Sequence, residues 1–131
     1  VYTHADCKDI LPTAIYGGKI DYYDTMPTVF QHSKINLNIT LKTIQTGIPL
    51  RAWDILGCDG FLLTNFQQEL CDFFNLGEDF VYYESPADAI EKAAYFLSHG
   101  RERQEIAHNA FEKIAASHTF HHRVQSMFEL I

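Results

Sequence analysis

Residues 47–65, which read G-I-P-L-R-A-W-D-I-L-G-C-D-G-F-L-L-T-N, carry the pattern that decides the fold. A loop punctuated by glycine and proline leads into residues 50–57, where apolar side chains recur at helical spacing. Residues 57–60 contain glycine and aspartate, which tolerate the left-handed conformation that ends many helices. Residues 61–63 form a short apolar run, typical of a strand covered on both faces. The stretch therefore predicts a helix, a tight turn and a buried strand in succession.

Strands and helices are expected to alternate on both sides of this stretch. Helical spacing appears near residues 25–33, 67–74, 85–98, 101–117 and 120–131, and strand-like runs appear near residues 1–5, 14–16, 35–40 and 80–83. This alternation predicts an α/β fold with a parallel sheet flanked by helices, followed by two extra C-terminal helices. No internal repeat and no obvious linker interrupts residues 1–131, so we expect a single domain.

Several details of the helices can also be predicted. Thr25 and Ser85 each precede an early proline and are expected to cap the helices that follow them. Apolar spacing selects the side chains expected to face the core: Leu70, Phe73 and Phe74; Ile90, Ala93, Ala94 and Leu97; and Ile106, Ala110 and Ile114. The last helix is expected to be amphipathic.

Residues 35–40 alternate strictly between apolar and polar side chains, which favours a strand. The polar side chains are those of Asn36, Asn38 and Thr40. One interpretation places this polar face in solvent at the edge of the sheet, and the other places it along a ligand-binding cleft. The sequence leaves both interpretations open.

Polar side chains also follow the buried strand, because Thr64 and Asn65 come directly after its apolar run. Ligands bind at the carboxyl edge of open parallel sheets. Thr64, Asn65 and, near the end of the preceding strand, Asn38 are therefore candidate binding residues.

Arg51 and Asp54 lie three positions apart and share one face of the helix expected at residues 50–57. In a functional interpretation, the free N–H groups at the start of this helix bind a phosphate, Arg51 adds positive charge, and Asp54 accepts hydrogen bonds from sugar hydroxyls. In a structural interpretation, the two side chains form a solvent-exposed pair that adds little to stability. Spacing alone favours the structural interpretation, because such pairs are common.

The composition narrows the classes of function. The chain has 131 residues, of which 47% are hydrophobic, and a formal net charge of −7. This charge argues against nucleic-acid binding and against docking on anionic membranes. No apolar run is long enough to span a membrane, and no signal peptide is visible. The 3 cysteines are widely spaced, which fits reduced thiols in a cytoplasmic protein.

Other familiar motifs are missing from the sequence. It contains no glycine-rich phosphate loop of the Walker or dinucleotide type and no G-x-S-x-G nucleophile motif. The histidines within residues 118–122 have a spacing that zinc sites use, but a helix-start role is favoured because no glutamate completes a protease motif. A receiver-like signalling domain has similar alternation, yet its clustered acids and its final lysine have no well-placed counterparts here.

Four strings in the sequence resemble a known family. They are Y-D-T-M-P-T-V-F-Q-H-S-K-I-N-L-N-I-T (residues 23–40), P-L-R-A-W-D-I-L-G-C-D-G-F-L-L-T-N-F-Q (49–67), E-I-A-H-N-A-F-E-K-I (105–114) and H-T-F-H-H-R (118–123). Together they resemble the glycosyltransferase-like proteins of the CgeB spore-protein type, among the group 1 glycosyl transferases. The likeness extends over the whole chain and is strongest over residues 22–67.

The resemblance implies a fold and a donor. It implies the C-terminal, Rossmann-like half of a two-domain GT-B glycosyltransferase, which binds a nucleotide-diphosphate sugar. Related retaining enzymes carry two glutamates separated by seven residues, of which the first touches the donor sugar and the second binds the ribose. The second position falls on Asp54, which is a shorter acid, and the first falls on Thr46, which is not acidic.

The resemblance also implies roles around these two positions. The diphosphate would receive backbone N–H groups from the loop formed by Gly47, Ile48, Pro49 and Leu50. Ile20 would lie near the base of the nucleotide. Arg51 would stabilise the departing diphosphate as the catalytic cation. No metal or other cofactor is implied, because a helix dipole and basic side chains can neutralise a diphosphate.

Parts of the implied machinery are expected outside this sequence. The first strand and helix of the donor domain would precede Val1, and a separate N-terminal domain would bind the acceptor. We therefore expect this chain to be a fragment that by itself binds nucleotide sugar weakly or not at all and transfers no sugar. The alternative is a non-catalytic GT-B-like module that binds a partner or a carbohydrate, which the threonine at position 46 fits.

Overall fold

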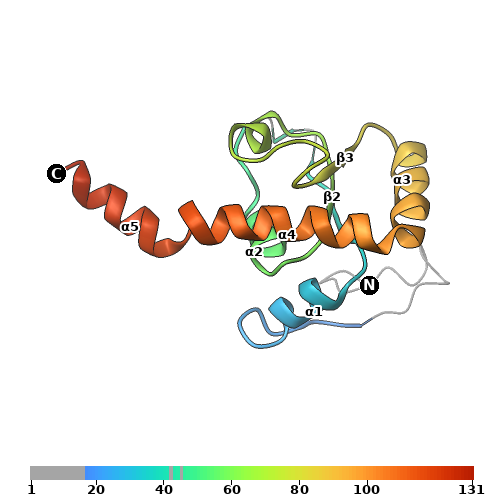
Figure 1. Cartoon of the computed structure of the whole chain (residues 1–131), viewed down its shortest axis with the longest axis horizontal. Helices are drawn as coiled ribbons and strands as arrows, with labels where there is room; N and C mark the ends of the chain where they lie inside the picture. Colours follow the sequence, from blue (N-terminus) through green and yellow to red (C-terminus); the bar gives the residue numbers. More distant parts are fainter. Residues whose placement is uncertain (1–16, 42, 45) are drawn as a thin grey trace.

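The computed structural model describes residues 17–41, 43–44 and 46–131. Its elements are α1 (Met26–His32), β1 (Asn36–Asn38), α2 (Leu50–Gly57), β2 (Leu62–Asn65), the 3₁₀ helix η1 (Gln68–Asp72), β3 (Val81–Tyr83), α3 (Pro86–Ser98), α4 (Gly100–Ser117) and α5 (Phe120–Glu129). Figure 1 shows α4 crossing the middle of the molecule, with α3 at one end and α5 extending away from the sheet at the other. The strands expected at residues 1–5 and 14–16 lie outside the described residues.

The described strands form one parallel sheet in the order β1-β2-β3. Asn38 pairs with Thr64, and Thr64 pairs in turn with Tyr82, so these three residues share one row of the sheet. The crossover from β1 to β2 contains α2, and the crossover from β2 to β3 contains η1. The predicted α/β class, with a parallel sheet flanked by helices and two further C-terminal helices, is confirmed.

Two hydrophobic clusters cover the two faces of the sheet. One joins the inner side of α2 to Leu62 and Phe80, and the other joins Phe96 of α3 to Leu63 and Val81. Helix α4 contributes to both clusters, through Ala110 in the first and through its preceding turn in the second. The burial of both faces explains why β2 is apolar until its last two residues.

Residues 47–65 fold as predicted. Helix α2 occupies residues 50–57, and Asp59 adopts the left-handed conformation with φ 60°. Gly60 follows at a point of close approach, where an added Cβ would lie 2.9 Å from the carbonyl oxygens of Phe30 and Ile55. Position 60 therefore has no room for a side chain, and Asp59 beside it adopts the left-handed conformation of the turn.

Strand β1 is buried on the side that the sequence pattern did not predict. The polar side chains of Asn36, Asn38 and Thr40 are buried, whereas Leu37 and Ile39 are 53% and 69% exposed. Both interpretations of the alternating pattern are therefore wrong, since the polar face lies neither in solvent nor along a cleft. The physical reason is that the amides have internal partners: Asn36 Nδ2 donates to the carbonyl oxygen of a residue in α1, at 2.9 Å.

The predicted helix starts and helix faces are only partly correct. Ser85 caps α3, because its hydroxyl oxygen accepts a hydrogen bond from the N–H of Asp88 at 3.2 Å. Thr25 precedes α1 but makes no side-chain cap. Helix α3 buries Phe96, which was not predicted. Of the predicted apolar set, Ala93 packs against the core, whereas Ile90 and Leu97 are exposed.

The predictions for residues 67–74 and for α4 are correct in part. The segment expected as a helix at residues 67–74 contains only the short 3₁₀ helix η1, which buries Leu70. After η1 ends, Phe73 is exposed and Phe74 is buried. Helix α4 buries Ile106 and Ala110 as predicted.

Helix α5 is attached to the body through its first turn. Thr119 and His122 form a capping box, which agrees with the predicted helix-start role of the histidine cluster. The guanidinium of Arg123 lies 5.8 Å from the ring centroid of Trp53, within the range of a cation–π interaction. The apolar side chains farther along α5, including Phe128, are exposed to solvent. Within the described part of the chain, no helix combines the length and the hydropathy that crossing a membrane requires.

Candidate functional site

A hollow of about 690 Å³ lies at the carboxyl edge of the sheet, where parallel sheets bind their ligands. The described residues that line it come from the segments that follow the three strands: Leu41, Ile44, Gly47, Asn65, Phe66, Gln67, Gln68, Glu69, Tyr82, Tyr83 and Glu84. Two of the residues predicted from sequence, Gly47 and Asn65, are among them. This hollow is the candidate site.

Gly47 presents its backbone N–H to a carboxylate. The N–H donates to Glu69 Oε1 at 3.1 Å, and the glycine adopts a φ of 91° that side-chain-bearing residues rarely take. Space beside the Cα is open, because an added Cβ would meet nothing within 4 Å. The amide at the start of the predicted diphosphate loop therefore already binds an anionic oxygen.

Asn65 fastens the loop that follows β1. Its Oδ1 accepts a hydrogen bond from the backbone N–H of Thr40 at 2.7 Å, and its Nδ2 donates to the carbonyl oxygen of Thr40 at 3.1 Å. This two-point contact imitates the pairing of adjacent strands beyond the end of β1 and β2. Asn65 thus shapes the wall of the hollow as well as lining it.

Asn38 and Thr64 are buried beneath the hollow. Asn38 Nδ2 donates to Thr64 Oγ1 at 3.1 Å and to Thr40 Oγ1 at 3.2 Å. The phenol of Tyr83 donates to the carbonyl oxygen of Asn38 at 3.2 Å, and burial raises the pKa of this phenol. In this conformation Asn38 and Thr64 support the carboxyl edge from below and do not face solvent.

Asp54 has a partner that sequence spacing did not reveal. Its Oδ2 accepts a hydrogen bond from the hydroxyl of Tyr22 at 2.7 Å, and this bond raises the pKa of Tyr22. Burial and, secondarily, the charge of Asp54 raise the pKa of the Cys58 thiol. Asp54 Oδ1 makes no hydrogen bond with the described residues, so one carboxylate oxygen is available to a hydroxyl.

Most of the other residues implied by the resemblance flank the start of α2 in the sequence. Arg51 is exposed in the first turn and makes no hydrogen bond or ion pair with the described residues. Thr46 is exposed, whereas Ile48 and Pro49 are half-buried, and Ile48 packs against the core. Ile20 is half-buried and is not among the described residues that line the hollow at the carboxyl edge.

The predicted site residues divide between two hollows. Asp54 and Leu50 line a second hollow of about 490 Å³ between α2 and the first turn of α5, while Gly47 and Asn65 line the first. The N-terminal turn of α2, with Arg51, belongs to the segment between them. The structure therefore does not bring the predicted residues into a single cavity.

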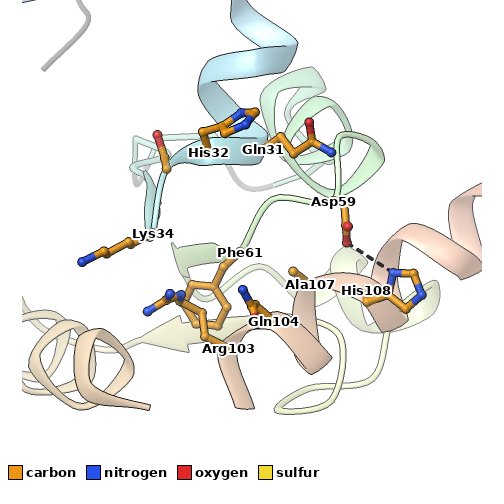
Figure 2. Close-up of a pocket in the computed structure, with 10 residues that line it drawn as sticks. Gln31, His32, Lys34, Asp59, Phe61, Arg103, Gln104, Ala107 and His108 are labelled. Carbon is orange, nitrogen blue, oxygen red and sulfur yellow. Dashed lines mark ion pairs between the residues drawn. The ribbon is translucent and has the colours of Figure 1, made fainter. Parts of the chain in front are cut away.

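A third hollow, of about 500 Å³, lies at the opposite edge of the sheet (Figure 2). Lys34 and Arg103 stand on one side of it, and on the other side Asp59 Oδ1 lies 3.6 Å from His108 Nδ1. None of the residues predicted from sequence lines this hollow. Its place at the amino ends of the strands sets it apart from the edge that parallel sheets use for ligands.

The comparison with protein families agrees with the observed α/β fold. A family model described as glycosyl transferase-like matches residues 5–129. The chain belongs to the glycosyl transferase-like family. No curated protein and no solved structure gives a match to the chain. The matched range of this glycosyl transferase-like domain includes every element from α1 to α5.

Sequence reasoning missed several residues of this glycosyl transferase-like domain. Gln67, Glu69 and Glu84 all line the hollow at the carboxyl edge, and Tyr22 binds Asp54. The position of Glu84 directly after β3 was a usable signal, because the same rule had selected the residues after β2. The Tyr22 contact joins residues 32 positions apart and left no local signal.

Proposed function

We propose that this chain is the donor-binding domain of a glycosyltransferase of the CgeB type, which moves a sugar from a nucleoside-diphosphate donor to an acceptor. Membership of the glycosyl transferase-like family supports this proposal. In it, the diphosphate binds at the turn of residues 47–50 and the start of α2, and Asp54 binds the ribose hydroxyls. The acceptor is bound by a second domain of a longer cytoplasmic protein.

One observation carries the proposal. The N–H of Gly47 donates to the carboxylate of Glu69, so this amide is oriented toward an anionic oxygen in the folded chain. A phosphate oxygen is a chemically equivalent acceptor, and backbone N–H groups at a helix start favour negative charge. The exposed guanidinium of Arg51, four residues farther along the chain, adds a cation without a competing partner among the described residues.

The proposed chemistry is electrostatic. The bond between the sugar and the diphosphate breaks, and the leaving nucleoside diphosphate gains negative charge. Groups that are positioned before the reaction stabilise that charge at little further cost. The backbone of the 47–50 turn and Arg51 supply these groups, and we expect Arg51→Ala to lower the turnover of the complete enzyme.

Calorimetric titration with inorganic pyrophosphate tests the binding step without assuming a base. We expect the unaltered chain to bind pyrophosphate and Arg51→Ala to bind it about tenfold more weakly, because a charge-assisted contact is lost. Arg101→Ala is the matched control, since Arg101 is also exposed and its only described partner is a glutamate on α4. Equal affinity in all three proteins would remove Arg51 from the site. Absence of pyrophosphate binding both by this chain and by the full-length protein would refute the diphosphate site.

A non-catalytic binding module is a second candidate. The observation that favours it is the exposed Thr46 at the position where related enzymes carry an acid that touches the donor sugar. A donor hydrolysis and transfer assay of the full-length protein separates the candidates. Turnover supports the transferase, and donor binding without turnover supports the module.

A further inference from the structure

Tyr22 and Asp54 form a contact between two segments that are distant in the sequence. The hydroxyl of Tyr22, in the loop before α1, donates to Asp54 Oδ2 on α2 at 2.7 Å. A hydrogen bond from a hydroxyl to a carboxylate is shorter and stronger than one between neutral groups. This bond therefore fixes the direction of a carboxylate that would otherwise rotate about its side-chain torsions.

The loop that carries Tyr22 is held by the residue before it. Asp21 Oδ1 accepts hydrogen bonds from the backbone N–H groups of Tyr23 and Asp24, at 2.9 and 2.7 Å. The carbonyl oxygen of Asp21 accepts a third hydrogen bond, from the N–H of Met26 at the start of α1, at 2.9 Å. The ring of Tyr22 also meets the ring of Tyr23 edge-on, with centroids 5.2 Å apart. The hydroxyl of Tyr22 therefore extends from an ordered turn.

Asp54 belongs to a helix that the core holds in place. Helix α2 buries Ala52, Ile55 and Leu56 almost completely, while Asp54 is only half-buried. The backbone of Asp54 is therefore fixed, and its side-chain torsions are the freedom that remains. Because Tyr22 already restrains these torsions, a hydroxyl that binds Asp54 costs less conformational entropy than it would cost with a mobile carboxylate.

The carboxylate of Asp54 can accept further hydrogen bonds beside the one from Tyr22. A carboxylate has about four acceptor positions on its two oxygens, and Tyr22 takes one of them. The hydrogen bond to Asp54 also raises the pKa of Tyr22, so the hydroxyl keeps its proton and remains a donor. Tyr22 therefore orients Asp54 without blocking it.

We propose that Tyr22 is a positioning residue, which holds the Asp54 carboxylate in the orientation that receives the 2′-hydroxyl of a ribose. The inference rests on the proposed function, in which Asp54 binds the ribose. It adds a source of specificity, since the pair distinguishes a ribonucleotide from a 2′-deoxyribonucleotide. A site built to bond a hydroxyl rejects the analogue that lacks it, because the polar group of the site is then left unpaired.

Calorimetric titration of the full-length protein with matched nucleotides tests the inference. The probes are UDP, GDP and ADP, each paired with its 2′-deoxy counterpart, and the measured quantity is the ratio of the two affinities. For at least one pair, we expect the unaltered protein to bind the ribonucleotide about tenfold more tightly. Tyr22→Phe is expected to reduce this ratio to about threefold and to leave the affinity for inorganic pyrophosphate unchanged.

Two further variants separate positioning from a general effect on structure. Tyr23→Phe is the matched control, because it removes the hydroxyl of the next residue, which is 84% exposed, and we expect it to keep the tenfold ratio. Asp54→Ala is expected to bring the ratio close to one. Adding Tyr22→Phe to Asp54→Ala is expected to change no affinity further, because Tyr22 acts through Asp54.

Other outcomes overturn the inference. It fails if Tyr22→Phe keeps the tenfold ratio, or if this variant binds the ribonucleotide more tightly, since the hydroxyl would then compete with the ribose. It also fails if Tyr22→Phe lowers nucleotide affinity in the Asp54→Ala background. In these cases the loss of preference in Asp54→Ala still supports the proposed function. A preference that Asp54→Ala leaves intact, or no preference in the unaltered protein, would refute the proposed ribose site and the inference with it.

Discussion

Glu69 is the residue whose contact says most about the candidate site. Its carboxylate receives the Gly47 N–H at the place where the proposed function puts a phosphate oxygen. A ligand that binds there exchanges one anionic acceptor for another. Glu69 therefore competes with the diphosphate, and the strength of that competition can be measured.

Glu69→Gln is expected to bind pyrophosphate about fivefold more tightly than the unaltered chain. The amide keeps an oxygen for the Gly47 N–H but removes a negative charge next to the ligand, which is worth about 1 kcal/mol across several ångströms of water. Glu91→Gln, an exposed change on α3, is the control with the same loss of charge. A lower affinity of Glu69→Gln would mean that the carboxylate supports the ligand.

A second prediction at the residue scale concerns Gly60. An added Cβ would approach two backbone carbonyl oxygens and Asn36 Nδ2 at 2.9 Å, so the backbone must shift. We expect Gly60→Ala to lower the free energy of unfolding by about 1–3 kcal/mol in urea denaturation. Gly57→Ala is the control, because its Cβ would meet only Ile114 at an ordinary 3.9 Å and alanine favours helix. Similar stability of the two variants would contradict the crowding at Gly60.

At the scale of elements, β1 buries its polar side chains in a hydrogen-bonded network and exposes its apolar side chains. Asn38 connects to Thr64 in β2 and receives Tyr83 from β3 on its carbonyl oxygen. The network spans the sheet just below the candidate hollow. Strand β1 is therefore held by its polar face.

This arrangement predicts an unusual order of mutational effects. Asn38→Ala removes the donor to two buried hydroxyls and is expected to lower the free energy of unfolding by about 1–3 kcal/mol. Leu37→Ala removes a half-exposed apolar side chain and is expected to cost less than about 1 kcal/mol. Urea denaturation of both variants checks the order. A larger loss of stability for Leu37→Ala would mean that the apolar face of β1 packs against the core.

The junction between α4 and α5 predicts a pH dependence. His118 packs on Trp53 with ring centroids 5.5 Å apart, and burial, followed by the charge of Arg123, lowers the pKa of His118. The unfolded imidazole takes up its proton near pH 6.5, above the folded one. This contribution to stability is therefore complete above that pH and is lost as the pH falls toward the lowered folded pKa.

Replacing the histidine tests that sign. His118→Gln is expected to lose less stability than the unaltered chain when the pH falls from about 7.5 to about 5, as followed by thermal unfolding. His121→Gln is the control, because its side chain is exposed on α5. An acid sensitivity of His118→Gln equal to that of the unaltered chain would contradict the lowered pKa of His118.

At the scale of the whole molecule, local signals predicted the fold and distant contacts decided the site. Helix α2, the left-handed turn at Asp59 and strand β2 follow from neighbouring residues, and each is confirmed. The burial of Asn38 and the partner of Asp54 depend on residues 26 and 32 positions away, which no spacing rule connects. The division of the predicted site residues between two hollows has the same cause.

The arrangement of the whole molecule gives the two edges of the sheet different chemistry. The carboxyl edge holds the Gly47 turn and the carboxylates of Glu69 and Glu84, while the amino edge holds the hollow with Lys34 and Arg103. If positive side chains alone decided where a diphosphate binds, it would bind at the amino edge. The proposed function requires backbone N–H groups and Arg51 to select the carboxyl edge instead.

Mapping of nucleoside diphosphates on the isotope-labelled chain tests this central claim most directly. Titration with UDP, GDP and ADP in turn is expected to give saturable shifts of the Gly47, Ile48 and Arg51 amides with at least one of the three. The amides of Lys34 and Arg103 are expected to stay in place. Shifts confined to Lys34 and Arg103, or no saturable shift with any of the three, would contradict the account.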